Sequence, residues 1–285
     1  MAHQPGDKIP DMGTLFLTAT PIGNLEDMSL RGMRILREVG LIAAEDTRHT
    51  RQLLTHFDIH TPLISYYEHN KLTRLDTILA ALSQGDVALV SDAGTPAIND
   101  PGYELVKAAL AAGHSISPVP GPCSPIAALV ASGLPTDSFL YLGYLPRKTS
   151  ERKALFERVG KLPYTLIFLE SPHRVLESLA DMQVFLGDRE AVAARELTKL
   201  FEQFIRGTIS QVRAHFLQNE PRGEFVLVIG GQVESSGEKW SEPALLAAID
   251  KSILDGKKAK EISAELSETS GWGKKEIYAL VTKAK

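Results

Sequence analysis

Short apolar runs alternate with helical patterns through the first half of this chain, and this alternation restricts the possible folds more than any other feature. The runs have the length and composition of buried strands and cover residues 14–19, 41–44, 61–66, 87–90 and 116–119. Between them, apolar residues recur at helical spacing, as in the segment carrying Leu72, Leu75, Leu79 and Leu82. The alternation predicts a mostly parallel sheet with helices on its faces.

The most constrained connection follows the run at residues 87–90, where the sequence reads SDAGTPAINDPG through Gly102. Gly94 permits positive φ and close approach of another molecule to the backbone. Asp100 before Pro101 predicts a helix N-cap with proline at the first helical position, and a helix that buries Tyr103, Val106 and Leu110. Open α/β sheets bind ligands at such strand ends, although an ordinary strand–helix connection is the competing interpretation.

The pattern changes near residue 138, where we place a domain boundary. Further strands are expected at residues 164–169, 191–194, 204–208 and 225–229, which favour a second, mixed sheet. A Ser-, Gly- and Glu-rich stretch then precedes 45 residues of helical pattern. The predicted organisation is a flexible tail (1–12), an N-terminal α/β domain (13–137), a second α/β domain (138–231), a linker (232–240) and a helical C-terminal domain (241–285).

Composition excludes several classes of protein. The formal net charge is −4, so any surface for nucleic acid must be local. Cys123 is the only cysteine, which rules out an internal disulfide or a cysteine zinc site and suits a cytoplasmic protein. No signal-peptide core or membrane-length apolar run is present. We expect no metal site, because the histidines do not have the spacing of metal ligands; the closest set is His49, His56, His60 and His69.

Three strings together are far more specific than a lone glycine pattern: TPIGNLEDMSLR at 20–31, AEDTRHT at 44–50 and SDAGTPAINDPG at 91–102. Supporting strings are PGPCS at 120–124, ESPHR at 170–174 and ARELTK at 194–199. With them, the chain closely resembles the ribosomal RNA small subunit methyltransferase I family of the tetrapyrrole-methylase superfamily.

The resemblance implies two α/β domains with S-adenosylmethionine in the cleft between them, and usually a homodimer. It implies 2′-O-methylation of a cytidine ribose in 16S small-subunit rRNA near the decoding centre, with the assembled small ribosomal subunit as the expected substrate. The alternative is methylation of a small tetrapyrrole-like molecule on the same fold. The first loop, ATPIGN, and Thr95 in place of an aspartate depart from the small-molecule enzymes and favour RNA. A non-catalytic cofactor-sensing or RNA-binding protein is the remaining reading.

By resemblance, cofactor contacts are expected in four segments of the chain. Pro21 is expected to shape the first loop. Glu224 and Phe225, in the string GEFVLV, are expected to lie near the adenine. The expected cofactor-binding residues are Pro21, Ala93, Gly94, Ile98, Cys123, Ser124, Glu224 and Phe225.

A ribose hydroxyl is a weak nucleophile at neutral pH, so the reaction benefits from a base or a donor network. Glu45 or Glu196 is the expected proton acceptor or hydroxyl-orienting group. Polar residues at the same strand ends are expected to bind substrate, the arginines through phosphates: Asp46, Arg48, Glu170, His173, Arg174, Arg195 and Lys199. The competing interpretations are structural: Asp46 caps a helix, residues 170–174 form a solvated helix start, and Arg195 pairs with a glutamate.

The C-terminal segment carries a local positive charge. Residues 251–285 contain eight lysines and five acidic residues, around a turn that resembles a helix-turn-helix. RNA contact is favoured, and a helical cap or dimerisation element is the alternative. Trp272 either stacks on a base or anchors the turn.

Overall fold

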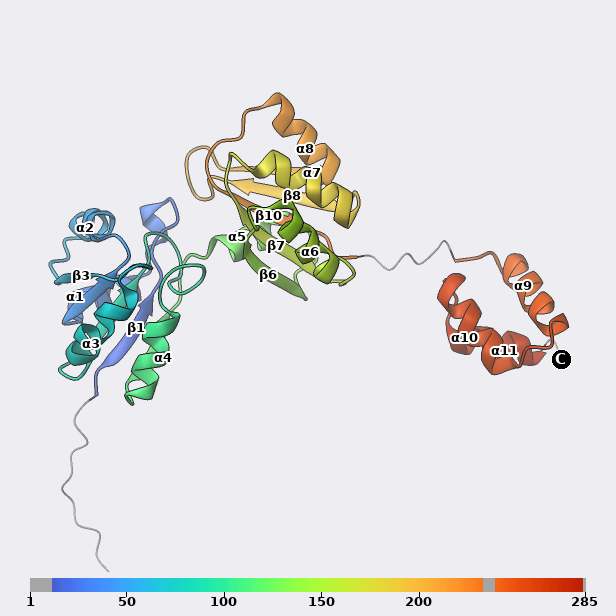
Figure 1. Ribbon diagram of the computed structural model, residues 1–285, viewed down its shortest axis with the longest axis horizontal. Coiled ribbons are helices and arrows are strands. Elements are labelled where there is room, and N and C mark those ends of the chain that lie inside the picture. The colour runs from blue at the N-terminus through green and yellow to red at the C-terminus, as the bar shows by residue number, and fades with distance from the viewer. Residues whose placement is uncertain (1–11, 233–238, 284–285) are drawn as a thin grey trace, which may run out of the picture. The chain divides into compact units, whose positions relative to one another are not determined.

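The computed structural model describes residues 12–232 and 239–283, and the chain forms two compact units, Met1–Gly230 and Gly231–Lys285 (Figure 1). The described part of the first unit contains two five-stranded sheets. Residues 1–11 of the expected tail and residues 233–238 of the expected linker lie outside the described residues.

Five parallel strands form the first sheet, in the order β3-β2-β4-β1-β5. Their bounds are β1 (Thr14–Thr18), β2 (Leu41–Ala44), β3 (Leu63–Ser65), β4 (Val87–Val90) and β5 (Ser115–Val119). All four residues of β4 are buried, as expected for a central strand covered on both faces. Because the strands are parallel, the loops that follow them all leave one edge of the sheet, where ligands bind in such folds.

Helices cover both faces of this sheet. Successive side chains of a strand point to opposite faces, so Val87 and Leu89 join an apolar cluster with α3 and α4, whereas Ala88 and Val90 join one with α1 and α2. A short 3-10 helix, η1 (Leu25–Asp27), precedes α1. The helices are α1 (Leu30–Glu38), α2 (Thr47–His56), α3 (Lys71–Leu82) and α4 (Tyr103–Ala111). The predicted mostly parallel sheet with helices on its faces is confirmed.

Helix α4 differs from the sequence-based expectation in its start and in its buried face. It begins at Tyr103 after an N-cap at Gly102, so Asp100 does not cap it. Tyr103 and Leu110 are 68% and 58% exposed, whereas Leu105 and Ala109 are fully buried. Both sets of residues have helical spacing, and the face that packs with α3 is the one with the small Ala109.

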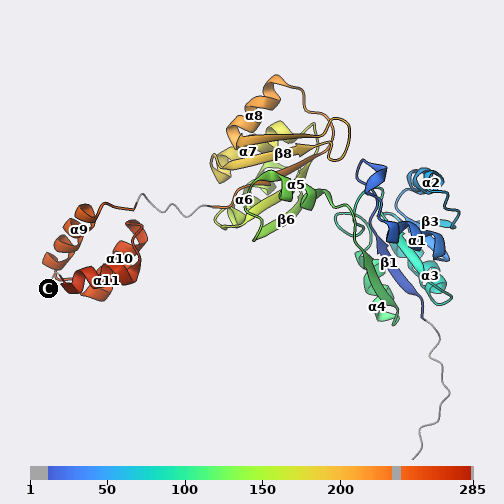
Figure 2. The ribbon, with the colours of Figure 1, turned by 180° about the vertical axis from the view of Figure 1, so that it is seen from behind.

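The second sheet is mixed, in the order β6-β7-β10-β8-β9, with β6 and β7 parallel and the other pairs antiparallel. Its β10 sends Val226 and Val228 into a cluster with α5, and Phe225, Leu227 and Ile229 into the larger core under α6, α7 and α8. Helices α7 and α8 lie side by side in both views (Figures 1 and 2). The strands are β6 (Phe139–Tyr144), β7 (Thr165–Glu170), β8 (Glu190–Arg195), β9 (Gln203–Thr208) and β10 (Phe225–Ile229); the helices are α5 (Ser124–Ser132), α6 (Thr149–Val159), α7 (Val175–Leu186) and α8 (Ile209–Gln218).

The described part of the second unit is helical, with α9 (Glu242–Leu254), α10 (Ala259–Thr269) and α11 (Lys274–Lys283). Its core consists of Leu245, Ile249, Ile262, Leu266, Ile277 and Val281. Trp272 anchors the α10–α11 turn, because its indole N–H donates to the Trp240 carbonyl at 2.7 Å and its ring lies 4.0 Å from the Lys239 ammonium. In the part of the chain that the structure describes, no helix is long and apolar enough to span a membrane.

Candidate functional site

The loop after β4 is tied to the loop after β1 by backbone hydrogen bonds. The Thr20 N–H donates to the Gly94 carbonyl at 2.9 Å, and the Gly94 N–H donates back to the Thr20 carbonyl at 3.1 Å. Gly94 has φ +85°, and a Cβ there would lie 3.2 Å from the Ile22 side chain. Ala97 and Asn99 also have positive φ, at +68° and +63°. Such strain in non-glycine residues is concentrated at functional sites, where surrounding contacts must hold it.

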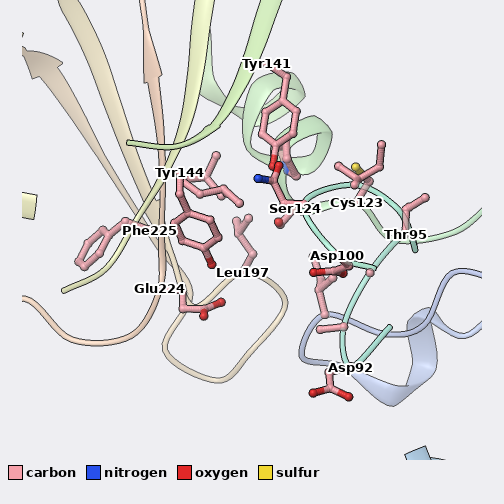
Figure 3. Close-up of a pocket in the computed structure, with 18 of the residues that line it drawn as sticks. Asp92, Thr95, Asp100, Cys123, Ser124, Tyr141, Tyr144, Leu197, Glu224 and Phe225 are labelled. Carbon is pink, nitrogen blue, oxygen red and sulfur yellow. The ribbon is translucent and has the colours of Figure 1, made fainter. Parts of the chain in front are cut away.

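This loop forms one wall of a pocket of about 260 Å³ (Figure 3). The first sheet contributes the loops after β2, β4 and β5, and the second contributes β6, the end of β7, the loop after β8 and the start of β10. The loop after β1 also lies close to the loop after β8 beside the pocket, because a Cβ on Gly23 would lie 2.8 Å from the Leu197 carbonyl oxygen. Residues from both α/β layers of the first unit therefore converge on one cavity.

Most of the residues expected at the cofactor and catalytic sites line this pocket. Pro21 does not, although its neighbour Ile22 does. The sequence-predicted residues in the lining are Glu45, Ala93, Gly94, Ile98, Cys123, Ser124, Glu196, Lys199, Glu224 and Phe225.

The lining also contains polar residues that sequence reasoning missed, among them Asp92, Asp100, Tyr141 and Tyr144. The sequence predicts Asp100 as a helix cap, and the two tyrosines follow the predicted domain boundary without forming part of a motif. Asp92 could have been identified from the sequence, because it lies two residues after the end of strand β4.

The pocket is acidic. Burial, followed by the charges of Asp100 and Asp92, raises the pKa of the Glu45 carboxyl. Burial also raises the pKa of Asp100, with smaller contributions from Asp92 and Glu224. Among the described residues, Lys199 is the one cationic side chain in the lining, and it forms an ion pair with Glu196 at 3.0 Å. The remaining carboxylates form a wall that suits a positively charged ligand.

The Tyr141 hydroxyl is buried and makes no hydrogen bond within the described residues. Burial raises the pKa of this hydroxyl, so it stays protonated and is able to donate. Buried polar groups are nearly always hydrogen-bonded. Together with the carboxylate wall, this hydroxyl fits a ligand that combines positive charge with polar acceptor atoms, as S-adenosylmethionine does.

Asp46 and Arg48 lie outside the pocket lining, and Asp46 has a structural function. Its carboxylate caps α2 by accepting the Arg48 N–H at 2.8 Å, and it pairs with the Arg48 guanidinium at 2.7 Å. The side-chain hydrogen bond from Arg48 is the main reason why the pKa of Asp46 is lowered. The Asp46 N–H donates to Asp92 at 3.0 Å, which fixes Asp92 beside the pocket. Arg48 remains mostly exposed.

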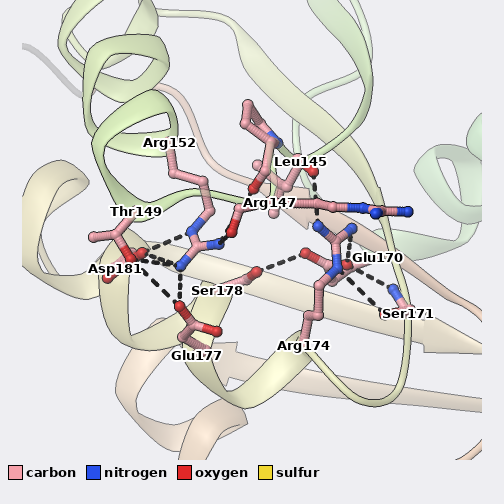
Figure 4. A network of polar contacts seen from close by, with 11 residues as sticks. Leu145, Arg147, Thr149, Arg152, Glu170, Ser171, Arg174, Glu177, Ser178 and Asp181 are labelled. Carbon is pink, nitrogen blue, oxygen red and sulfur yellow. Dashed lines mark hydrogen bonds and ion pairs between the residues drawn. The ribbon is translucent and has the colours of Figure 1, made fainter.

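Glu170 is not positioned to contact substrate, which corrects the sequence-based expectation. It is fully buried, where its carboxylate pairs with Arg174 at 2.6 Å and accepts the Ser178 hydroxyl at 2.6 Å (Figure 4). Arg174 also donates to the Leu145 carbonyl at 3.1 Å, so its charge is committed inside the fold. The reading of residues 170–174 as a solvated helix start is wrong for these two residues, although His173 is exposed.

Arg195 donates to the Gln203 side chain at 2.8 Å across β8 and β9, so its partner is an amide and not the expected glutamate. Beyond it, the backbone is strained at Glu196 and Thr198, with φ +50° and +64°. Lys199 and Glu196 form an ion pair on this loop. Within residues 12–232 and 239–283, no three potential metal ligands gather, and Cys123 is a free, half-buried thiol.

The parallel sheet, the strained loop after β4 and most residues of the pocket between two α/β layers lie within a segment that matches a family model, and this match makes the chain a methylase of the tetrapyrrole type. Residues 14–213 match the family described as Tetrapyrrole (Corrin/Porphyrin) Methylases. The structure of uroporphyrin-III C-methyltransferase from Thermus thermophilus, complexed with S-adenyl homocysteine, superposes with a TM-score of 0.53 and covers 76% of this chain and 97% of its own, at 20% identity.

Two relatives narrow the assignment. The Ribosomal RNA small subunit methyltransferase I of Halalkalibacterium halodurans is 45% identical over 272 residues, covering 94% of each chain. The protein of that name from Pseudomonas aeruginosa is 48% identical over 261 residues, covering 90% of this chain and 93% of its own. The chain belongs to the ribosomal RNA small subunit methyltransferase I family.

Proposed function

We propose that this protein transfers the methyl group of S-adenosylmethionine to the 2′-hydroxyl of a cytidine in 16S small-subunit rRNA, near the decoding centre. The observation that carries the proposal is the acidic pocket at the carboxyl ends of the parallel strands. Family membership supports the reaction and the RNA substrate. The proposal includes a cytoplasmic homodimer acting on the assembled small ribosomal subunit.

The cofactor supplies an electrophilic methyl group on a positively charged sulfonium. Ala93, Gly94 and Ile98 form one wall of the pocket, and Cys123 and Ser124 lie in the adjoining wall. Glu224 and Phe225 border the opposite wall at the start of β10, where we place the adenine. The carboxylates of Asp92 and Asp100 would complement the sulfonium and ammonium charges.

Glu45 is the better of the two candidate bases. Its pKa is raised, which makes its carboxylate a stronger proton acceptor, and no ion-pair partner is found for it among the described residues. The Glu196 carboxylate lies 3.0 Å from the Lys199 ammonium and is therefore already engaged in an ion pair. We assign proton acceptance to Glu45 and orientation of the ribose to Glu196 and Lys199. Positioning of the hydroxyl and the methyl group in line supplies much of the remaining acceleration.

The exposed Arg48 and His173 and the lysines of the C-terminal helices are proposed RNA contacts. Trp272 is held in the α10–α11 turn by its hydrogen bond to Trp240, which favours the anchoring interpretation over base stacking. Lys274 and Lys275 begin α11 and are exposed, as a nucleic-acid-binding helix requires.

The test is transfer of tritium from labelled S-adenosylmethionine to small-subunit RNA, offered naked and as assembled subunits that lack the modification. Nuclease digestion then separates label on the ribose from label on the base. We expect label on a cytidine ribose, lost in Glu45→Gln and kept in Glu38→Gln, an exposed glutamate that pairs with Arg34 on α1. No transfer to either RNA, with cofactor binding intact, would reject the proposal and favour the small tetrapyrrole substrate.

A further inference from the structure

Two arginines of the second sheet's helical layer hold one loop by its backbone (Figure 4). The Arg174 guanidinium donates to the Leu145 carbonyl at 3.1 Å. The Arg152 guanidinium donates to the next two carbonyls, those of Pro146 at 3.2 Å and Arg147 at 2.8 Å. Three successive carbonyls after β6 are thus bound by charged donors, which make the stronger class of hydrogen bond.

Both supporting arginines are neutralised by acidic side chains. Arg152 is fully buried, and Asp181 and Glu177 of α7 pair with it at 2.6 and 2.5 Å. Burial lowers the pKa of Arg152, but these two carboxylates outweigh it and raise the pKa. Arg174 is paired with the buried Glu170. Both arginines are therefore fixed by carboxylates while their remaining donors hold the loop carbonyls.

The loop at residues 145–147 carries an exposed arginine, Arg147, for which the structure gives no ionic partner among the described residues. Its side chain also makes no hydrogen bond within that part of the chain. The neighbouring Lys148 is less available, because it pairs with Glu151 at 3.3 Å. In Figure 4 the Arg147 side chain extends away from Arg152 and runs past the Arg174 guanidinium.

This loop begins at the wall of the pocket. Tyr144, the last residue of β6, lines the pocket, and the Leu145 N–H donates to the carbonyl of Leu169, another lining residue, at 3.3 Å. Arg147 is the third residue after Tyr144, so their Cα atoms are at most about 11 Å apart. A nucleotide whose ribose enters the pocket would carry its flanking phosphates within reach of the long arginine side chain.

We infer that Arg147 binds a phosphate of the rRNA strand next to the methylated nucleotide, and that Arg152 and Arg174 are positioning residues for it. The inference rests on the proposed function. A guanidinium offers a planar pair of donors that matches two phosphate oxygens, and a rigid backbone under it lowers the entropy lost on binding. Phosphate contacts of this type set the register of the nucleic acid without reading its sequence.

The test compares Arg147→Ala with Arg158→Ala in methylation of assembled small subunits. Arg158 is an exposed arginine near the other end of α6, so both variants lose the same charge. For Arg147→Ala we expect KM for the subunit to rise about tenfold, the loss of one charged hydrogen bond. The expected kcat stays within about twofold, affinity for S-adenosylmethionine is unchanged, and the salt dependence of kcat/KM becomes shallower by about one unit of slope.

The same KM and salt slope in Arg147→Ala and Arg158→Ala would overturn the inference. Failure of the unsubstituted protein to label any RNA would instead reject the proposed function, so the two failures are distinguishable. Arg174→Lys tests the positioning role by a double-mutant cycle. It should raise KM in the unsubstituted background and have little further effect in Arg147→Ala, whereas purely additive effects would contradict positioning through Arg147.

Discussion

Replacement of the buried Arg152 by methionine should destabilise the first unit far more than loss of the charge of its exposed partner Glu177. The change removes donors to Asp181, Glu177, Thr149 and two loop carbonyls. It leaves Asp181, only 16% exposed, without its cation. Removing one partner of a buried pair costs about 3–5 kcal/mol, and the methionine recovers only the packing of the aliphatic stem.

Urea unfolding followed by far-UV circular dichroism measures the effect. With a slope of about 2–3 kcal/mol per molar urea, the transition midpoint of Arg152→Met should fall by about 1–2 M. Glu177→Gln is the matched control, because Glu177 is 59% exposed and its ion pair should contribute less than about 1 kcal/mol. An Arg152→Met midpoint equal to that of the unsubstituted protein, or an equal loss in Glu177→Gln, would refute the reasoning.

Three further predictions concern the pocket. The pKa of Asp100 is raised in the folded state, so the folded protein loses stability as pH rises and this carboxyl ionises. Asp100→Asn should therefore increase the free energy of unfolding at pH 8. This gain should disappear below about pH 4, where the carboxyl is protonated and resembles the amide. Glu45→Gln should slow methyl transfer at least about 100-fold and abolish the acidic limb of the pH–rate profile, and a limb that persists would point to another base. Gly143→Ala should weaken S-adenosylmethionine binding in calorimetry, because its Cβ would lie 2.6 Å from the Asn99 side chain. Gly133 also has a positive φ but faces open space, so Gly133→Ala should leave binding unchanged.

The layered α/β fold was predictable because each buried strand is a compact apolar run bounded by turn residues. Val87–Val90 is an example: all four residues are buried, and the polar loop follows directly. Helix faces were less predictable. Leu72 is 67% exposed although it has the spacing of an inward residue, whereas Ile78 of the same helix is fully buried. Spacing alone cannot choose between two overlapping apolar stripes, since the choice depends on which neighbour packs against the helix.

The site was predictable where ligand-binding groups follow strand ends, as Glu45, Gly94 and Glu196 do. Polar residues that support the fold had the same appearance in the sequence. Glu170 stands at a strand end, yet it is buried against Arg174. The distinction depends on the fold, because α7 turns back against the end of β7 and brings Arg174 and Ser178 onto the Glu170 carboxylate. Arg147 was not identified from the sequence, because it differs from nearby cations only in having no ionic partner among the described residues. Lys148, Arg152 and Arg174 all form ion pairs.

Both tryptophans of the chain, Trp240 and Trp272, lie in the C-terminal unit, where they share a hydrogen bond and Trp272 lies against the Lys239 ammonium. Selective excitation of indole in the full-length protein therefore reports on this unit alone. Binding of RNA to the C-terminal helices should change the emission, whereas occupation of the pocket, which is lined by tyrosines, should not. The chain thus carries an intrinsic optical probe that separates the two binding events without any label.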